Sequence, residues 1–192
     1  MGLVIYLHGF ASKGESPKSI LLAENLAGHT VVAPDLPLDP AALEQQITEI
    51  VESHHERPVV FVGTSLGGFW ANYFAQRFDA PCVIANPSPS PSVTLARRAN
   101  QDTPVYGTDR TVRVTDVVLS GLLRAESYLV NNTNGALINL FVAKDDEQLD
   151  YQAMLAAFPF TAFKAVMETG GHRFEQHWPL VVKRVKELVG DV

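Results

Sequence analysis

A serine flanked by glycines has the setting in this chain that most favours nucleophilic chemistry. The run Gly63-Thr64-Ser65-Leu66-Gly67-Gly68 fits the pattern G-x-S-x-G, follows an apolar run and precedes an amphipathic segment. In a sharp turn between strand and helix, glycines at 63 and 67 let the two backbones approach while the serine hydroxyl projects outward. The pattern predicts that Ser65 is a nucleophile; the alternative is a glycine-rich turn that Ser65 only caps. A phosphate-binding loop is disfavoured because no lysine follows the glycine.

Two histidines lie in loops that follow predicted strands. His172 comes after Gly170-Gly171 near the C-terminus. Histidine titrates near neutral pH and suits proton transfer. We therefore predict that His172 is the base for Ser65, the alternative being a solvated loop histidine. His8 stands in Leu7-His8-Gly9-Phe10, and we expect it to make its loop rigid by hydrogen bonding rather than to contact a substrate.

A histidine base needs a carboxylate that fixes its tautomer. Four acids lie between Ala143 and Tyr151, after another predicted strand. Asp145 and Asp146 are adjacent, and a loop of this kind can direct only one of them at the histidine. We expect the other to face solvent or the N-terminus of the following helix. The next candidates along the chain are Asp116 and Asp150.

Acyl transfer also needs two backbone N–H groups that bind the developing oxyanion. The residue after the nucleophile, Leu66, would supply one of them. The loop after the first strand would supply the other, which we assign to Phe10. The residues that we expect to support these loops are His8, Gly9, Gly63 and Gly67.

Strand and helix patterns alternate along the chain, which predicts a three-layer α/β sandwich around a mostly parallel sheet. Apolar runs typical of strands cover 3–7, 30–33, 59–62, 82–85, 136–142 and 163–167. Helical spacing covers 18–27, 40–54, 66–78, 116–130, 150–158 and 177–189. Residues 86–113 are expected to be irregular, because prolines crowd their start. Ligands bind beyond the carboxyl ends of the strands in such sheets, which is where the candidate residues fall.

Six short runs spread over the chain are typical of one family. They are Ile5-Tyr6-Leu7-His8-Gly9-Phe10, Ser16-Pro17-Lys18-Ser19, Gly63-Thr64-Ser65-Leu66-Gly67-Gly68-Phe69-Trp70-Ala71, Asn86-Pro87-Ser88, Asp146-Glu147-Gln148-Leu149-Asp150-Tyr151 and Gly171-His172-Arg173-Phe174. On these residues the chain resembles the YqiA-type esterase family of small α/β-hydrolases, and the order serine, acid, histidine agrees with that fold.

The resemblance implies an α/β-hydrolase fold without a large cap domain. It implies a serine carboxylesterase that forms an acyl-enzyme intermediate, and it points to Asp146 as the acid. The family usually has glycine where Asp145 stands. Residues 93–124 match the family less well, so we expect this segment to form the wall of an acyl pocket. Its candidate side chains are Leu95, Val105, Tyr106, Leu119, Leu122 and Leu123.

Length and composition limit the remaining classes. A chain of 192 residues, 46% apolar and 19% charged, favours a single domain over 1–192. A formal net charge of -6 argues against a nucleic-acid partner. Cys82 is the only cysteine, and we expect no disulfide, metal or cofactor. No apolar run is long enough to predict a membrane span, so the cytoplasm is the expected location.

The partner expected from these features is a small acyl ester or thioester. Two alternatives stay open. One is an acyl-CoA thioesterase with the same mechanism, and the other is a non-catalytic binding protein on the same fold. The sequence does not decide between a monomer and a homo-oligomer.

Overall fold

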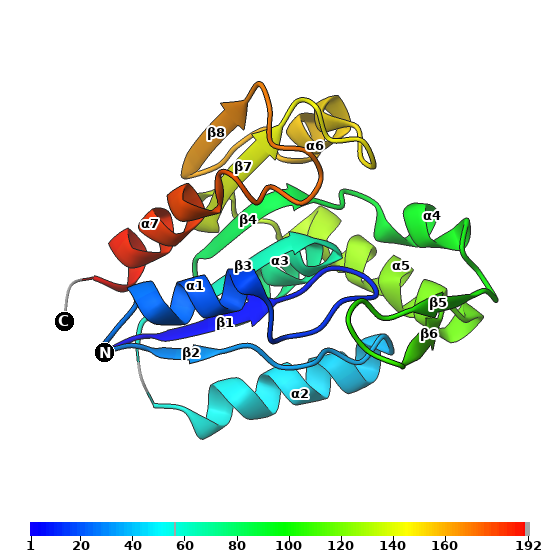
Figure 1. The fold of residues 1–192 in the computed structure, drawn as a ribbon, viewed down its shortest axis with the longest axis horizontal. Helices are drawn as coiled ribbons and strands as arrows, with labels where there is room; N and C mark the ends of the chain where they lie inside the picture. Colours follow the sequence, from blue (N-terminus) through cyan, green and yellow to red (C-terminus); the bar gives the residue numbers. More distant parts are fainter. Residues whose placement is uncertain (56, 191–192) are drawn as a thin grey trace.

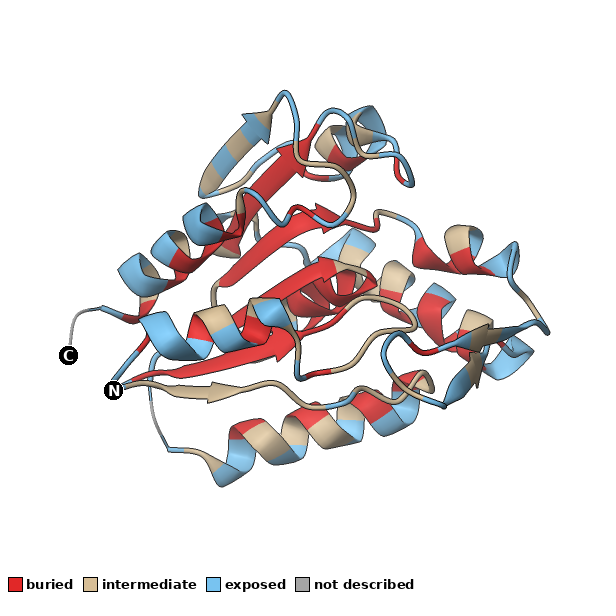
Figure 2. Ribbon diagram, viewed as in Figure 1, coloured by how far each residue is buried: buried red, intermediate tan, exposed pale blue. Residues whose placement is uncertain are grey.

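The computed structural model describes residues 1–55 and 57–190. Within them, six parallel strands form one sheet in the order β2-β1-β3-β4-β7-β8 (Figure 1). The strands are β1 (Leu3–Leu7), β2 (Thr30–Val32), β3 (Val59–Ser65), β4 (Cys82–Pro87), β7 (Ile138–Ala143) and β8 (Phe163–Met167). Every residue of β1, β4 and β7 is buried (Figure 2), as their continuous apolar runs predict for strands covered on both faces.

Helices cover both faces of this sheet. On one face, α1 (Pro17–Asn25) and α7 (Trp178–Val189) pack against one group of strand side chains. The other face is covered by α2 (Pro40–Ser53), α3 (Leu66–Phe78), α5 (Asp116–Asn132) and α6 (Tyr151–Ala157). The predicted three-layer α/β sandwich is therefore confirmed.

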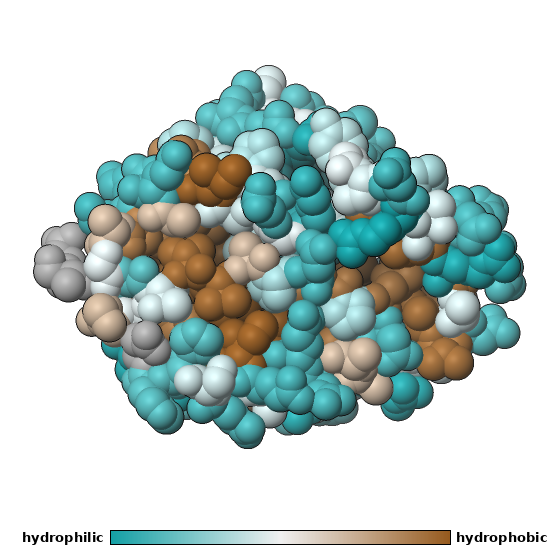
Figure 3. All heavy atoms as spheres, turned by 60° about the horizontal axis from the view of Figure 1, so that its bottom comes forward, coloured by the Kyte–Doolittle hydropathy of each residue, from teal (hydrophilic) through white to brown (hydrophobic). Residues whose placement is uncertain are grey.

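Apolar spacing explains why these helices form and which side each one buries. In α2, Leu43, Ile47 and Val51 recur every four residues and are buried, so they lie on one stripe. Asp39 caps the N-terminus of this helix by accepting a hydrogen bond from the N–H of Ala42 at 2.9 Å. The face shown in Figure 3 is mostly hydrophilic, with apolar side chains gathered in patches between the polar ones.

The segment that was expected to be irregular contains more structure than its prolines suggest. The strand β4 continues to Pro87, and α4 (Pro91–Ala96) begins with a proline. Proline is tolerated there because the first N–H of a helix has no partner within the helix. Two short strands, β5 (Asp102–Pro104) and β6 (Thr111–Arg113), then form an antiparallel hairpin. The expectation of an irregular chain over 86–113 is wrong at these places.

This hairpin rests on the loop that follows β1. The N–H of Tyr106 donates to the carbonyl of Ala11 at 2.9 Å. Arg110 also pairs with Asp35 at 2.7 Å, and the same carboxylate accepts from the N–H of Gly14. The hairpin is small, and no large cap domain is present in residues 1–55 and 57–190. No helix in the described part combines the length and apolar character that crossing a membrane requires.

Candidate active site

Ser65 lies at the junction of β3 and α3 in an unusual backbone conformation. Its φ is 55° and its ψ is -124°, a region that residues other than glycine rarely adopt. A Cβ on Gly63 would collide with the carbonyl oxygen of Gly67, and one on Gly67 with the carbonyl oxygen of Leu7. Both glycines are therefore required for the close approach of strand and helix, and the turn presents the hydroxyl at the carboxyl edge of the sheet.

His172 connects this serine to Asp146. Its Nε2 lies 3.0 Å from the Oγ of Ser65, and its Nδ1 lies 2.9 Å from Oδ2 and 3.0 Å from Oδ1 of Asp146. A carboxylate only accepts hydrogen bonds, so Nδ1 carries the hydrogen and the lone pair of Nε2 faces Ser65. The three side chains come from the end of β3 and the loops after β7 and β8. In this arrangement the imidazole can accept the hydroxyl proton.

The Asp146 carboxylate is withdrawn from solvent and held by the backbone. Its side chain is 0% exposed, against 12% for His172. Its Oδ1 also accepts hydrogen bonds from the N–H groups of Gln148 and Leu149, each at 2.8 Å. These donors compensate the burial of the charge and fix the direction in which the carboxylate faces.

The acids on either side of Asp146 bind the backbone of the histidine loop. Asp145 Oδ1 accepts from the N–H of Gly171 at 2.8 Å, and Glu147 Oε2 accepts from the N–H of His172 at 2.8 Å. That second hydrogen bond lowers the pKa of Glu147. Asp145 is exposed to solvent, as expected, but its carboxylate also binds the histidine loop rather than the N-terminus of the following helix. Of the other acids considered, Asp150 caps α6 and Asp116 begins α5.

His8 uses both ring nitrogens on backbone groups. Nε2 accepts from the N–H of Leu36 at 3.0 Å, so Nδ1 carries the hydrogen and donates to the carbonyl of Gly9 at 2.8 Å. Burial lowers the pKa of His8. The ring thus ties the loop after β1 to the chain that follows β2.

The two amides proposed for an oxyanion lie beside the serine. Leu66 is the first residue of α3, so its N–H has no acceptor within the helix. Phe10 follows Gly9, which lies close to the nucleophile. A Cβ built on Gly9 would lie 3.6 Å from the Cβ of Ser65. In the described part of the chain, the Phe10 N–H has no backbone acceptor.

Sequence reasoning did not single out Asn86 as a site residue. Its side chain is completely buried, and its φ of 42° is one that asparagine tolerates better than most residues. Nδ2 donates to the carbonyls of Gly171 at 2.9 Å and His172 at 3.3 Å, while Oδ1 accepts from the N–H of Ala143 at 2.8 Å. Asn86 thus joins the ends of β4 and β7 to the histidine loop. The signals in the sequence are a polar residue at the end of an apolar run and its place in the run Asn86-Pro87-Ser88.

Two hollows lie beside the turn that contains Ser65 and Leu66. The larger, of about 340 Å³, contains the side chains of Ser65 and His172 together with two cationic residues, Lys18 and Arg173. Burial lowers the pKa of Lys18 to about 8. Its ammonium lies 5.2 Å from the ring centre of Trp178. Arg173 pairs with Glu175 at 2.9 Å, on the rim of the same pocket.

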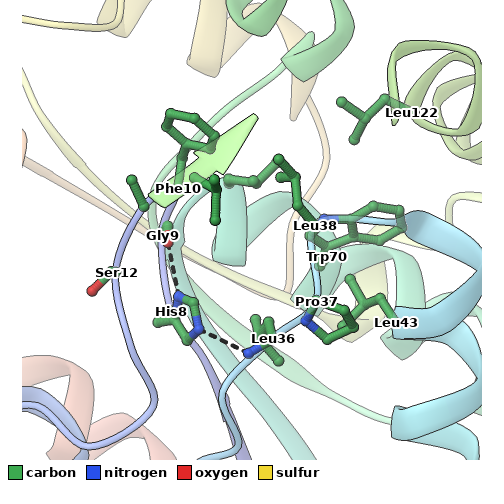
Figure 4. A pocket seen from close by; sticks show the side chains of 13 residues that line it. His8, Gly9, Phe10, Ser12, Leu36, Pro37, Leu38, Leu43, Trp70 and Leu122 are labelled. Atoms are coloured by element: carbon green, nitrogen blue, oxygen red, sulfur yellow. Dashed lines mark hydrogen bonds between the residues drawn. The ribbon is translucent and has the colours of Figure 1, made fainter. Parts of the chain in front are cut away.

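The smaller hollow, of about 40 Å³, is apolar (Figure 4). The segment expected to wall an acyl pocket contributes Leu122 and Val112 to it, and Tyr106 to the larger pocket. The other expected residues, Leu95, Val105, Leu119 and Leu123, line neither hollow, so those parts of the expected wall are wrong. The rest of the lining comes from the loops after β1 and β2 and from α2 and α3.

No cluster of three or more His, Cys, Asp or Glu side chains within residues 1–55 and 57–190 is arranged to hold a metal ion. Cys82 is completely buried in β4, and this burial raises the pKa of its thiol to about 12.

The fold is that of several solved proteins with little sequence in common. Est1E from Butyrivibrio proteoclasticus matches with a TM-score of 0.72 and 17% identity over 97% of this chain and 86% of its own. Mouse alpha/beta hydrolase domain-containing protein 10 gives 0.71 and 15%, over 97% and 89%. A monoacylglycerol lipase from Paleococcus ferrophilus gives 0.65 and 19%, over 98% and 94%. At these identities the likeness shows the α/β-hydrolase fold alone.

A match to a family model covers nearly the whole chain, including all six runs of residues that carry the resemblance to the YqiA-type esterases. The model is described as an uncharacterised protein family, UPF0227, and it matches residues 3–188. The chain therefore belongs to the UPF0227 family, the YqiA-type family of proteins with the α/β-hydrolase fold.

Proposed function

We propose that this protein is a serine hydrolase that cleaves carboxylic esters through an acyl-enzyme intermediate. The observation that carries the proposal is the chain of contacts from Ser65 Oγ to His172 Nε2, at 3.0 Å, and from His172 Nδ1 to Asp146 Oδ2, at 2.9 Å. Hydroxyl, imidazole and carboxylate in this order make a serine nucleophilic at neutral pH. The α/β-hydrolase fold and the structural similarity to a monoacylglycerol lipase support a hydrolase.

The reaction would proceed in two displacements. His172 Nε2 accepts the hydroxyl proton while Ser65 Oγ bonds to the carbonyl carbon, whose π electrons move onto oxygen. When this intermediate collapses, the bond to the leaving alcohol breaks and the alcohol takes the proton from His172. Water then attacks the acyl-enzyme in the same way and releases the acid. The carboxylate of Asp146 stabilises the imidazolium in both steps.

The N–H groups of Phe10 and Leu66 would bind the oxyanion. Leu66 lies at the N-terminus of α3, where the partial positive charge of the helix also favours a negative oxygen. Donors of this type are fixed before the reaction begins, so they stabilise the transition state without reorganisation.

Replacement of the nucleophile tests the proposal. We expect Ser65→Ala to fold as the unaltered protein does, to lose hydrolysis of p-nitrophenyl butyrate by a factor on the order of 10⁶, and to escape labelling by a fluorophosphonate probe. Circular dichroism checks the fold. An unaltered protein that neither hydrolyses esters nor takes the label would instead favour a binding protein on the same fold.

A thioesterase acting on acyl-CoA is the second candidate, and one observation favours it. Lys18 and Arg173 lie in the pocket that contains Ser65, and Lys18 has no carboxylate within ion-pair distance among the described residues. An ammonium there would attract the phosphates of a coenzyme A leaving group. We expect Lys18→Met to lower kcat/KM for butyryl-CoA more than for p-nitrophenyl butyrate; equal losses for both substrates would contradict this candidate.

A further inference from the structure

The two hollows meet along one loop. Gly9, Phe10 and Ser12 belong to the lining of both. Only the larger hollow includes Ser65 and His172, whereas the smaller includes Leu66 and reaches inward to Trp70. A substrate whose carbonyl carbon lies at Ser65 can therefore extend in two directions from the reacting bond.

The chemistry of the reaction assigns each direction. The leaving alcohol receives its proton from Nε2 of His172, so it must lie in the pocket that His172 lines. The carbonyl oxygen must face the N–H groups of Phe10 and Leu66, which both line the smaller hollow. The acyl chain is the remaining substituent on the carbonyl carbon, and the smaller hollow, whose lining is mostly apolar rather than cationic, suits it better than the larger one.

We propose that this smaller cavity is the acyl site and that Leu122 sets the length of the chain it accepts. The inference rests on the proposed function and names the substrate class: esters of short, unbranched, uncharged acids. A cavity of about 40 Å³ holds roughly three water-sized groups, since one such group needs about 10–15 Å³. With the carbonyl carbon at Ser65, three further carbons correspond to a butyryl group.

Leu122 is placed to close the cavity. In Figure 4 it lies with Trp70 on the side opposite Gly9 and Phe10. Its helix, α5, cannot move closer to α2, because Gly121 already packs so closely against Pro40 that a Cβ there would collide with the proline ring. Leu122 is 1% exposed and belongs to the core cluster. Shortening this side chain should therefore lengthen the cavity rather than let the helix close over the space.

The experiment compares kcat/KM for p-nitrophenyl acetate, butyrate, hexanoate and octanoate. We expect the unaltered protein to prefer butyrate and Leu122→Ala to prefer hexanoate or octanoate. Each methylene that leaves water raises kcat/KM by about fourfold, so two additional methylenes should shift the ratio of hexanoate to butyrate by about fifteenfold. The matched control is Leu123→Ala, the next residue on α5, which is 54% exposed and outside the lining, and which should leave the order of preference unchanged.

A second variant protects the test against loss of folding. Val112 lines the same cavity from the β5–β6 hairpin and is partly exposed, so Val112→Trp should be accommodated and should make the cavity smaller. We expect this variant to lose several-fold more activity on butyrate than on acetate. Unchanged chain-length preference in both variants would overturn the inference, and so would an unaltered protein that hydrolyses octanoate as well as butyrate.

Failure of this inference differs visibly from failure of the proposed function. A fluorophosphonate probe with a small alkyl group should label Ser65 in all the variants. If the unaltered protein takes the label and hydrolyses acetate while the preference does not move, only the acyl site is wrong. If it does neither, the proposed function itself is wrong.

Discussion

His8 and His172 occupy similar places and have different surroundings. Each lies in a loop beyond the carboxyl end of a strand, His8 after β1 and His172 after β8, and each has a glycine next to it in the chain. The ring of His8 bonds only to backbone groups, those of Leu36 and Gly9. The ring of His172 bonds to two side chains, Asp146 and Ser65. A histidine in a strand-end loop is therefore suited to proton transfer only when the fold brings the right side chains to its nitrogens.

Backbone partners and side-chain partners have different consequences for the ring. The N–H of Leu36 needs an unprotonated Nε2, so protonation of His8 would lose that hydrogen bond as well as oppose the burial of the ring. The carboxylate of Asp146 instead stabilises a charged ring, and the hydroxyl of Ser65 can supply the proton. One environment holds a histidine neutral, and the other allows its charge to change during a reaction.

Replacing each histidine by alanine should give the largest contrast. His172→Ala removes the base, and we expect turnover of p-nitrophenyl butyrate to fall by a factor on the order of 10⁶. His8→Ala leaves the Leu36 N–H without its partner, which should cost about 1–3 kcal/mol in the free energy of unfolding. Its turnover should fall by less than about 10², the loss typical of a site displaced by about 1 Å.

Turnover number and chemical denaturation separate these effects. Equal losses of turnover in the two variants, with both folded, would mean that His8 takes part in the reaction. The comparison between the two loops would then be wrong.

The adjacent acids offer the next largest contrast. Asp146→Asn retains the shape of the side chain but favours the wrong tautomer of His172, so we expect turnover to fall by about 10⁴, as in serine proteases. Asp145→Asn retains an oxygen that can accept from the N–H of Gly171, and should reduce turnover by less than about tenfold. Steady-state kinetics on both variants checks this, and a crippled Asp145→Asn with an active Asp146→Asn would reverse the assignment.

Two buried asparagines allow a test of positioning. Asn86 joins β4 and β7 to the histidine loop, whereas Asn139, at the opposite end of β7, donates to the carbonyl of Cys82 at 2.9 Å and accepts from Arg184 at 2.8 Å. Each replacement by alanine should cost about 1–3 kcal/mol of stability. Only Asn86→Ala should also lower kcat, by about 10², because a shift of about 1 Å in the histidine loop suffices for such a loss.

The kinetic constants decide this point. We expect KM for p-nitrophenyl butyrate to change little in either variant, since neither asparagine lines a pocket that holds the substrate. A loss of kcat in Asn139→Ala that matches the loss in Asn86→Ala would show that general loosening of the sheet is responsible.

The smallest expected effect concerns stability and pH. Burial lowers the pKa of His8 below 6.5, so the unfolded chain binds a proton there more readily than the folded protein does. Above pH 6.5 the ring is neutral in both states, and the protein keeps its full stability. As the pH falls below that value, the free energy of unfolding decreases. The slope is at most about 1.4 kcal/mol per pH unit. His8→Gln should remove this part of the pH dependence, measured by denaturation at several pH values; an unchanged slope would contradict it.

Local patterns were sufficient to predict most of the fold. Continuous apolar runs indicate buried strands, and apolar spacing indicates the faces of α2, α3 and α7, because each of these signals lies within a few neighbouring residues. The prediction of an irregular chain was wrong where a proline stands at the end of a strand or at the start of a helix. Pro87 ends a strand and Pro91 begins a helix, and at both places a proline costs little because its missing N–H is not needed.

The sequence by itself determined the Ser65 turn, because the glycines that permit it stand within two residues of the serine and their close contacts follow from the pattern. It also determined the order along the chain of the six strands of the main sheet and of the six helices that cover it. Only the tertiary structure decided that Asp146 faces the imidazole while Asp145 and Glu147 hold the backbone of its loop. The tertiary structure likewise revealed the contacts of Asn86 and the apolar cavity that Leu122 helps to line. These features join segments that are 25 or more residues apart in the chain, and the distance between such segments depends on how the whole sheet and its helices pack.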